Sequence, residues 1–281
     1  MTSSTAPVIA GISHDQPAVV LHALREASRL DTSLRIVHCH LAPAGDVYVG
    51  SDSREPTRSA GFEVLASARA TIEATGQSAV VEYVLERGDP ATCLVEESAD
   101  AAVVVVGADD VNWVERMLGG EVSGHLALKA ACPVVVVPRE QDAGRTTGGV
   151  VVTLDGDTSS AGPLRYGFEQ ADYRSEDLHV LHATPEATTQ ADTAALTTRV
   201  TQEVGRWNEL TPDVKVLLSL TNGDALEQCV RATSLASLLV IGRPHGHSFS
   251  FALTRPVAML VLREARCPVA IVPAGYGAAR S

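Results

Sequence analysis

Two glycine-led segments hold most of the side chains with which this sequence could do chemistry. The segment 242–255 contains no acid, and its side chains that are or can become cationic are Arg243, His245, His247 and Arg255. The segment 107–121 has the lone Arg116 against four acids, Asp109, Asp110, Glu115 and Glu121. Like charges 4 Å apart repel by about 1 kcal/mol even in water, and by more when desolvated. A bound anion such as a phosphate is therefore favoured at the first segment and disfavoured at the second. For the side chain of Arg255 there are two alternatives to binding an anion. It fills the space that a phosphate needs, or it lies solvated on the surface.

Other reactive side chains form no recognisable catalytic or metal motif. Ser13-His14-Asp15 holds the residue types of a catalytic triad, but consecutive residues cannot take up its spatial arrangement. The chain has neither a Gly-x-Ser-x-Gly elbow nor a phosphate-binding Gly-x-x-x-x-Gly-Lys loop. His38 and His182 occupy matching places in two strand-like runs, where a hydrogen bond that caps the strand end is favoured over metal binding. We expect no metal site.

The sequence that positions these segments is duplicated within the chain. Three anchors have a match 135 positions later: Gly88-Asp89 and Cys132-Pro133 recur unchanged, and Val106-Gly107 corresponds to Ile241-Gly242. Upstream the offset becomes 144, because Val37-His38 matches Leu181-His182. A constant spacing across glycine, cysteine and proline anchors indicates a duplication. We predict domains at 1–140 and 148–281, joined by a linker at 141–147 where the apolar pattern lapses.

Each copy alternates short apolar runs with helical periodicity. Several of the runs are apolar on both faces, which is typical of a parallel sheet covered by helices on both sides. The fold class predicted is α/β, with two tandem doubly wound domains, each built on a five-stranded parallel sheet. The predicted strands are 8–12, 34–40, 80–85, 102–107 and 134–137, then 150–154, 177–182, 214–220, 238–242 and 269–272. Because an open apolar edge strand invites aggregation, we expect 134–137 and 269–272 to pair about a pseudo-twofold axis.

Composition excludes several classes of function. The 281 residues are 45 % hydrophobic and carry a net charge of −12, with no basic block to neutralise a nucleic acid or an anionic membrane. The apolar runs are too short to cross a bilayer, and no secretion signal is apparent at the start of the sequence. Five cysteines without a Cys-x-x-Cys fit a reducing compartment, so we expect a cytoplasmic protein. Cys132 and Cys267, each just before a buried run, are predicted to be packing residues.

These features together resemble the universal stress protein family in its tandem, two-domain form. The resemblance rests on Val8-Ile9-Ala10-Gly11, on Gly88-Asp89-Pro90-Ala91 and on the run Ala-Cys-Pro-Val-Val-Val-Val-Pro at 131–138. It extends through the second copy, from the apolar run at 150–156 to Cys267-Pro268. The family resemblance implies an adenine nucleotide alpha hydrolase-like fold. Many members of the family bind ATP through Gly-x-x-Gly, nine residues, then Gly-Ser or Gly-Thr, together with an Asp after the first strand.

Carried over to this sequence, the ATP motif is altered in both copies. Copy one keeps Gly107 and Gly120, but has Asp110 at the middle glycine and Ser13 in place of the aspartate. Copy two keeps its aspartate and first glycine, but has His245 at the middle glycine and Arg255 at the last one. The candidate site in copy two is Asp155, His182, Gly242, His245 and Arg255, and the degenerate one in copy one is Ser13, Gly107 and Gly120.

The resemblance implies a stress-response function, and we weigh two forms of it. The first is a non-catalytic regulatory module with degenerate nucleotide-binding motifs. The alternative is a protein that binds ATP, or another adenine nucleotide, at the end of the strands in copy two. An enzyme is not expected, because no nucleophile and base are assembled in the sequence. We expect a homodimer or a pseudo-dimeric monomer.

Overall fold

The computed structural model of the protein describes residues 6–40, 55–108, 126–139, 148–154, 161–184, 190–243 and 257–277. The chain divides into two compact units, Met1–Arg139 and Glu140–Ser281, each with its own sheet and core. The linker predicted at 141–147 lies outside the described residues, so the domain limits stay a prediction. The pairing predicted for the two edge strands depends on the placement of the units, and it also stays a prediction.

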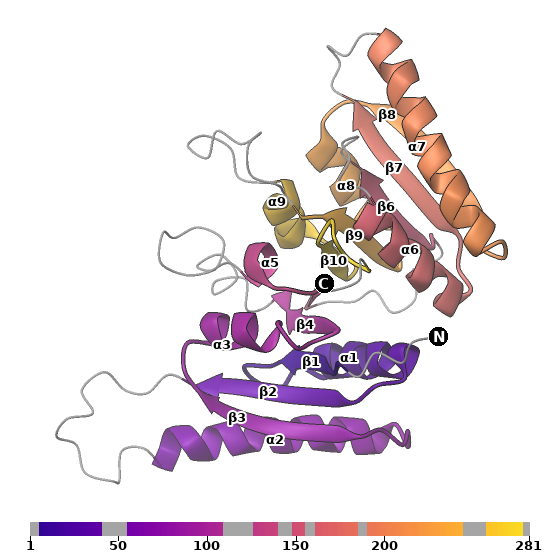
Figure 1. The fold of residues 1–281 in the computed structure, drawn as a ribbon. Coiled ribbons are helices and arrows are strands. Elements are labelled where there is room, and N and C mark those ends of the chain that lie inside the picture. Colours follow the sequence, from indigo (N-terminus) through magenta and orange to yellow (C-terminus); the bar gives the residue numbers. More distant parts are fainter. Residues whose placement is uncertain are drawn as a thin grey trace. The chain divides into compact units, whose positions relative to one another are not determined.

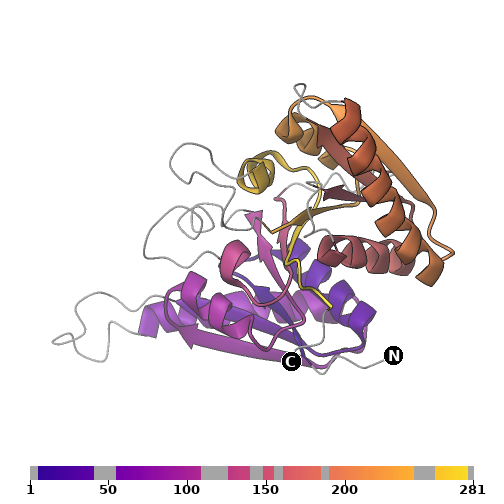
Figure 2. The ribbon, with the colours of Figure 1, turned by 45° about the horizontal axis from the view of Figure 1, so that its top comes forward.

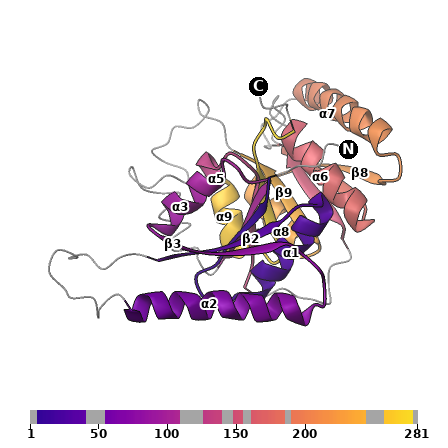
Figure 3. The same ribbon diagram turned by 60° about the horizontal axis from the view of Figure 1, so that its bottom comes forward.

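Unit 1 is a parallel sheet with helices on both faces. Its strand order is β3-β2-β1-β4-β5, and each neighbouring pair is parallel. The strands are β1 (Val8–Gly11), β2 (Leu34–His40), β3 (Val81–Arg87), β4 (Val103–Gly107) and β5 (Val134–Val137). The helices are α1 (Pro17–Leu30), α2 (Glu55–Ala74), α3 (Pro90–Glu97) and α5 (Leu126–Lys129). α1 and α2 cover one face and α3 and α5 the other, and Figure 3 shows α2 lying along β2 and β3.

Unit 2 repeats this architecture. Its strand order is β8-β7-β6-β9-β10, again with each neighbouring pair parallel. The strands are β6 (Val150–Leu154), β7 (Leu178–Thr184), β8 (Val216–Asn222), β9 (Leu238–Gly242) and β10 (Val269–Val272). The helices are α6 (Ala161–Arg174), α7 (Gln190–Leu210), α8 (Ala225–Thr233) and α9 (Val257–Glu264). Helices α6 and α7 pack on one side and α8 and α9 on the other (Figure 1, Figure 2).

The predicted fold class, two tandem doubly wound units with five parallel strands each, is confirmed. The main errors lie at strand ends. β3, β7 and β8 each continue two residues beyond the predicted end, to Arg87, Thr184 and Asn222. These ends are set by pairing with the neighbouring strand, since His40 pairs with Arg87 and Thr184 with Asn222. A local apolar pattern does not report that pairing, because the paired end residues are polar.

The central strands of unit 1 are buried along their whole length. Every residue of β1 and β4 is buried, as parallel strands covered on both faces require. In unit 2 the fully buried Phe168 of α6 stacks on Trp207 of α7, with ring centroids 6.3 Å apart. Trp207 therefore packs against the core. Among the helices that the structure describes, none is long and apolar enough to cross a membrane.

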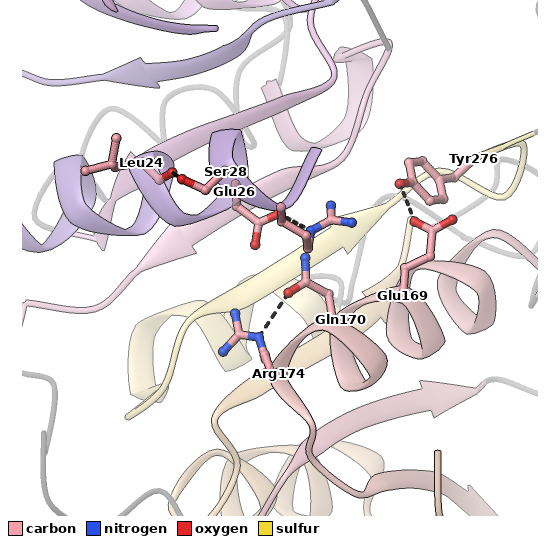
Figure 4. Close-up of polar contacts among 8 residues, drawn as sticks. Leu24, Glu26, Ser28, Glu169, Gln170, Arg174 and Tyr276 are labelled. Atoms are coloured by element: carbon pink, nitrogen blue, oxygen red, sulfur yellow. Dashed lines mark hydrogen bonds and ion pairs between the residues drawn. The ribbon is translucent and has the colours of Figure 1, made fainter. Parts of the chain in front are cut away.

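The helix that follows the first strand of each unit carries a polar pair one turn apart. On α1, Arg29 donates to Glu26 over 3.0 Å, and both side chains are buried. On α6, Arg174 donates to the fully buried Gln170, also over 3.0 Å (Figure 4). A hydrogen bond from Tyr276 to Glu169, 2.8 Å long, holds the segment after β10 against α6. Within each helix the arginine thus satisfies a buried side-chain oxygen, of Glu26 in α1 and of Gln170 in α6.

The repeated Gly-Asp motif begins α3 and α8. Asp89 accepts a hydrogen bond from the backbone N–H of Thr92, and Asp224 accepts from those of Leu226 and Glu227. Each aspartate is therefore an N-cap, which satisfies amide groups that have no partner within the helix. The motif that reveals the duplication is explained by helix capping.

We predict that Asp224→Ala destabilises the protein by about 0.5–2 kcal/mol, because two N-cap hydrogen bonds to α8 are lost. Denaturant unfolding gives the free energy of unfolding of the variant and of the wild-type protein, and their difference is the loss. Asp224→Asn retains an acceptor and is expected to restore most of the stability, while Asp213→Ala, at an exposed position before β8, is the matched control. Equal losses for Asp224→Ala and Asp213→Ala would contradict the capping role.

Candidate functional site

Each sheet has one place where a ligand can enter between strand ends. After β1 the chain crosses to β2 on one side, and after β4 it crosses to β5 on the other. In doubly wound sheets ligands bind at such a reversal, so the carboxyl ends of these two strands, called the crevice below, are the candidate site. In unit 2 the same reversal occurs between β6 and β9. The predicted site residues on the described part of the chain lie at or near these strand ends.

Half of the predicted site residues lie in the described part of the chain. Ser13 follows β1, Gly107 ends β4, Gly242 ends β9 and His182 lies in β7. The others, Gly120, Asp155, His245 and Arg255, lie outside the described residues. Their roles in a site stay predictions.

A histidine fixes the strand end beside the crevice in both units. In unit 2 the Nδ1 atom of His182 lies 2.6 Å from the carbonyl oxygen of Leu154, the last residue of β6. In unit 1 the Nδ1 atom of His38 lies 2.8 Å from the carbonyl oxygen of Ile12, just beyond β1. Nδ1 donates in each case, since a carbonyl can only accept. This is the strand-end hydrogen bond expected for these histidines.

In unit 1 the crevice is filled by the protein's own glutamine. Gln16 is 7 % exposed, and its Oε1 accepts a hydrogen bond of 3.0 Å from the backbone N–H of Ser13. Its amide nitrogen lies against Gly107, so close that a Cβ on Gly107 would collide with it. The sequence analysis missed Gln16, because nothing in its local pattern brings its side chain to Gly107, which lies 91 positions later.

The polar residues after β1 do not form a catalytic triad. The Oγ of Ser13 and the Nδ1 of His14 are 2.8 Å apart and exposed. Asp15, the residue that would orient the imidazole in a triad, accepts instead from Ser67 of α2 over 2.7 Å. A triad needs its acid on the second ring nitrogen of the histidine, and here the acid is bonded elsewhere.

In unit 2 the corresponding glycine is Gly242, at the end of β9. A Cβ on Gly242 would meet the ring of Pro163 at 3.3 Å, and no other described atom within 4 Å. Pro163 corresponds to Val19, which borders Gly107 in unit 1. The counterpart of Gln16 is the smaller Ser160, which lies outside the described residues. The backbone N–H of Arg243 donates 2.8 Å to Val272, so the start of the loop after β9 is fixed by β10.

Comparison with known proteins agrees with this duplicated architecture. The model of the universal stress protein family matches residues 7–138 and 148–273. The chain belongs to the universal stress protein family. A universal stress protein of Mycobacterium tuberculosis is 28% identical over 273 residues, which cover 96% of each chain. Another from the same organism is 29% identical over 267 residues, covering 92% of this chain and 96% of the relative.

A solved structure agrees in fold across the same span. The universal stress protein from Archaeoglobus fulgidus matches with a TM-score of 0.71 at 17% identity, covering 96% of this chain and 97% of that one. The tandem arrangement predicted from the repeat is therefore confirmed for this universal stress protein.

The two cysteine thiols in unit 2 of this universal stress protein are buried and unreactive. Burial raises the pKa of Cys267 to about 12 and that of Cys229 to about 11. Since the thiolate is the reactive form, both are protonated at neutral pH. Cys267, 2 % exposed before β10, is a packing residue as predicted.

We predict that His182→Ala costs more stability than His38→Ala. Each change removes the same type of hydrogen bond, but His182 is 4 % exposed and His38 is only half-buried. A buried carbonyl left without its donor costs about 1–3 kcal/mol, whereas water replaces the donor at a wetter position. Denaturant unfolding of the two variants gives the comparison. An equal or reversed order would contradict this role for His182.

Proposed function

We propose that this universal stress protein is a non-catalytic regulatory module of a stress response, with an adenine-nucleotide site retained only in unit 2. Membership of the family supports the stress-response role. The observation that carries the asymmetry is the buried side chain of Gln16, which occupies the crevice of unit 1 at Gly107.

The crevice of unit 1 fits a nucleotide poorly for two reasons. Gln16 covers the glycine at which a phosphate needs close approach to the backbone. The sequence after Gly107 also places Asp110 at the middle glycine and Glu121 at the Ser or Thr of the family motif, with Asp109 beside Asp110. Desolvated carboxylates beside a phosphate are repulsive.

The strand ends of unit 2 fit such a ligand better. Asp155 directly follows Leu154, and the carbonyl of Leu154 is held by His182. The loop that carries this aspartate therefore starts from a fixed point, and Asp155 is proposed to hold the nucleoside. Across the crevice, Gly242 is followed by Arg243, His245 and Arg255 without an acid. Gly242, His245 and Arg255 are proposed to surround the phosphates.

A regulatory rather than catalytic role is supported by the side chains beside the crevices. Ser13 and His14 are bonded to each other, but Asp15 does not orient them. In the described part of the chain no group of three histidine, cysteine or acidic side chains is placed to hold a metal ion. The cytoplasmic location and the homodimer or pseudo-dimeric monomer stay predictions.

We expect ATP at millimolar concentration to raise the melting temperature of the full chain. A ligand at 100 times its Kd stabilises the native state by about 2.7 kcal/mol. Differential scanning fluorimetry is the measurement, and calorimetric titration is expected to give one nucleotide per chain. Asp155→Ala is expected to abolish the shift, because it removes the contact proposed for the nucleoside.

Ser13→Ala is the matched control, since Ser13 is the counterpart of that aspartate in unit 1. The Ser13→Ala variant is expected to keep the rise in melting temperature that ATP causes. Loss of the shift in Ser13→Ala with retention in Asp155→Ala would place the site in unit 1. No shift in the wild-type protein would reject ATP as the ligand.

We expect no release of phosphate from ATP above the buffer rate, since the described strand ends hold no complete set of nucleophile, base and orienting acid. A sensitive phosphate assay over hours tests this. Turnover that disappears in Arg255→Ala would show that unit 2 is a catalytic site.

A further inference from the structure

Two of the five cysteines meet in unit 1, between β2 and α3. Cys39 lies near the carboxyl end of β2, and Cys93 lies in the first turn and a half of α3. The two thiols lie close enough together for each to affect the pKa of the other. Both are half-buried, whereas Cys132, Cys229 and Cys267 are buried. The pair is therefore within reach of small molecules in solution.

The contact follows from the way α3 lies on the sheet. Arg35 and Cys39 are four apart on β2 and so point to the same face. Their partners on α3 are Glu97, which accepts from Arg35 over 2.8 Å, and Cys93, one helical turn earlier. The helix thus runs antiparallel to the strand, with an ion pair at one end and the two thiols at the other.

The start of α3 fixes the sulfur of Cys93. Asp89 caps the helix, and its carbonyl accepts from the N–H of Cys93 over 3.0 Å. The sulfur lies against Gly88, where a Cβ would come within 2.7 Å of it. Gly88 in turn donates 3.0 Å to the carbonyl of His40, the residue after Cys39. Cap, glycine and strand end therefore hold the two thiols together.

Unit 2 has the same backbone without the thiols. Cys39 pairs with Glu86 in the β2–β3 register, and the equivalent pair in β7–β8 is Ala183 with Thr221. The counterpart of Cys93 on α8 is Gln228. The fold therefore does not require cysteine at either position, and the pair belongs to unit 1 alone.

We propose that Cys39 and Cys93 form an oxidation site, a dithiol that closes reversibly into a disulfide linking β2 to α3. With glutathione disulfide as oxidant, the thiolate of one cysteine attacks a glutathione sulfur, forms a mixed disulfide and releases one glutathione thiolate. The second cysteine loses its proton and attacks the protein sulfur of that mixed disulfide, and the second glutathione leaves. Two protein thiols are oxidised, glutathione disulfide is reduced to two glutathiones, and the protons pass to the leaving thiolates.

The environment of the pair makes the reaction slow at neutral pH. Burial raises the pKa of both thiols, and the nearby carboxylate of Glu86 raises them further. Because the thiolate is the nucleophile, the rate is expected to rise about tenfold per pH unit while the pH is below the pKa. The site therefore responds to sustained oxidation rather than to brief pulses of oxidant.

The test uses the full chain, reduced and then incubated with glutathione disulfide at pH 8. The protein is denatured, alkylated with N-ethylmaleimide and weighed by mass spectrometry. We expect labelling to fall from five thiols to three, with a loss of two hydrogens and no retained glutathione. Peptide mapping is expected to find Cys39 linked to Cys93, and the oxidised protein to melt a few degrees higher until dithiothreitol reverses the change.

Serine variants separate this pair from the other thiols. Cys39→Ser and Cys93→Ser are each expected to prevent the intramolecular link, and Cys229→Ser, at a buried thiol of unit 2, to leave it intact. Peptide mapping of the wild-type protein decides the question if a variant fails to fold. Five labelled thiols after oxidation, a link between other cysteines, or stable glutathione adducts without a link would overturn the proposal.

Discussion

A parallel sheet that is covered on both faces needs apolar side chains on both faces. This requirement limits where polar, reactive side chains can lie in this protein. Strands such as β4, buried at every residue, cannot hold a polar site along their length. Polar function is therefore confined to the strand ends and to helix starts near them. The crevices at Gly107 and Gly242, the two histidines and the pair of thiols all lie in these places.

Duplication let the two units share one scaffold while their strand ends diverged. The hydrogen bond from a histidine to the neighbouring strand end is present in both, as are the aspartate caps of α3 and α8. These interactions hold the backbone and are independent of any ligand. The divergence lies in the side chains beside them, above all Gln16 in unit 1.

A division of roles follows from that divergence. Unit 1 fills its crevice with its own side chain and carries a dithiol between β2 and α3. Unit 2 has neither cysteine at those positions and carries the cationic loop after Gly242. In our proposals one unit senses oxidation and the other binds a nucleotide, so that a single chain receives two different signals.

The sequence by itself determined the duplication, the five strands of each unit and the fold class, because these depend on local apolar patterns and on the constant offset between anchors. It also located the ends of β4 and β9, where Gly107 and Gly242 follow continuous apolar runs. It misplaced the ends of β3, β7 and β8, since those depend on the pairing of β3 with β2 and of β7 with β8. Gln16 over Gly107, and Cys39 beside Cys93, were decided only by the tertiary structure. Each joins residues more than fifty positions apart, and such contacts arise from the packing of helix on sheet, which leaves no trace in the neighbouring residues.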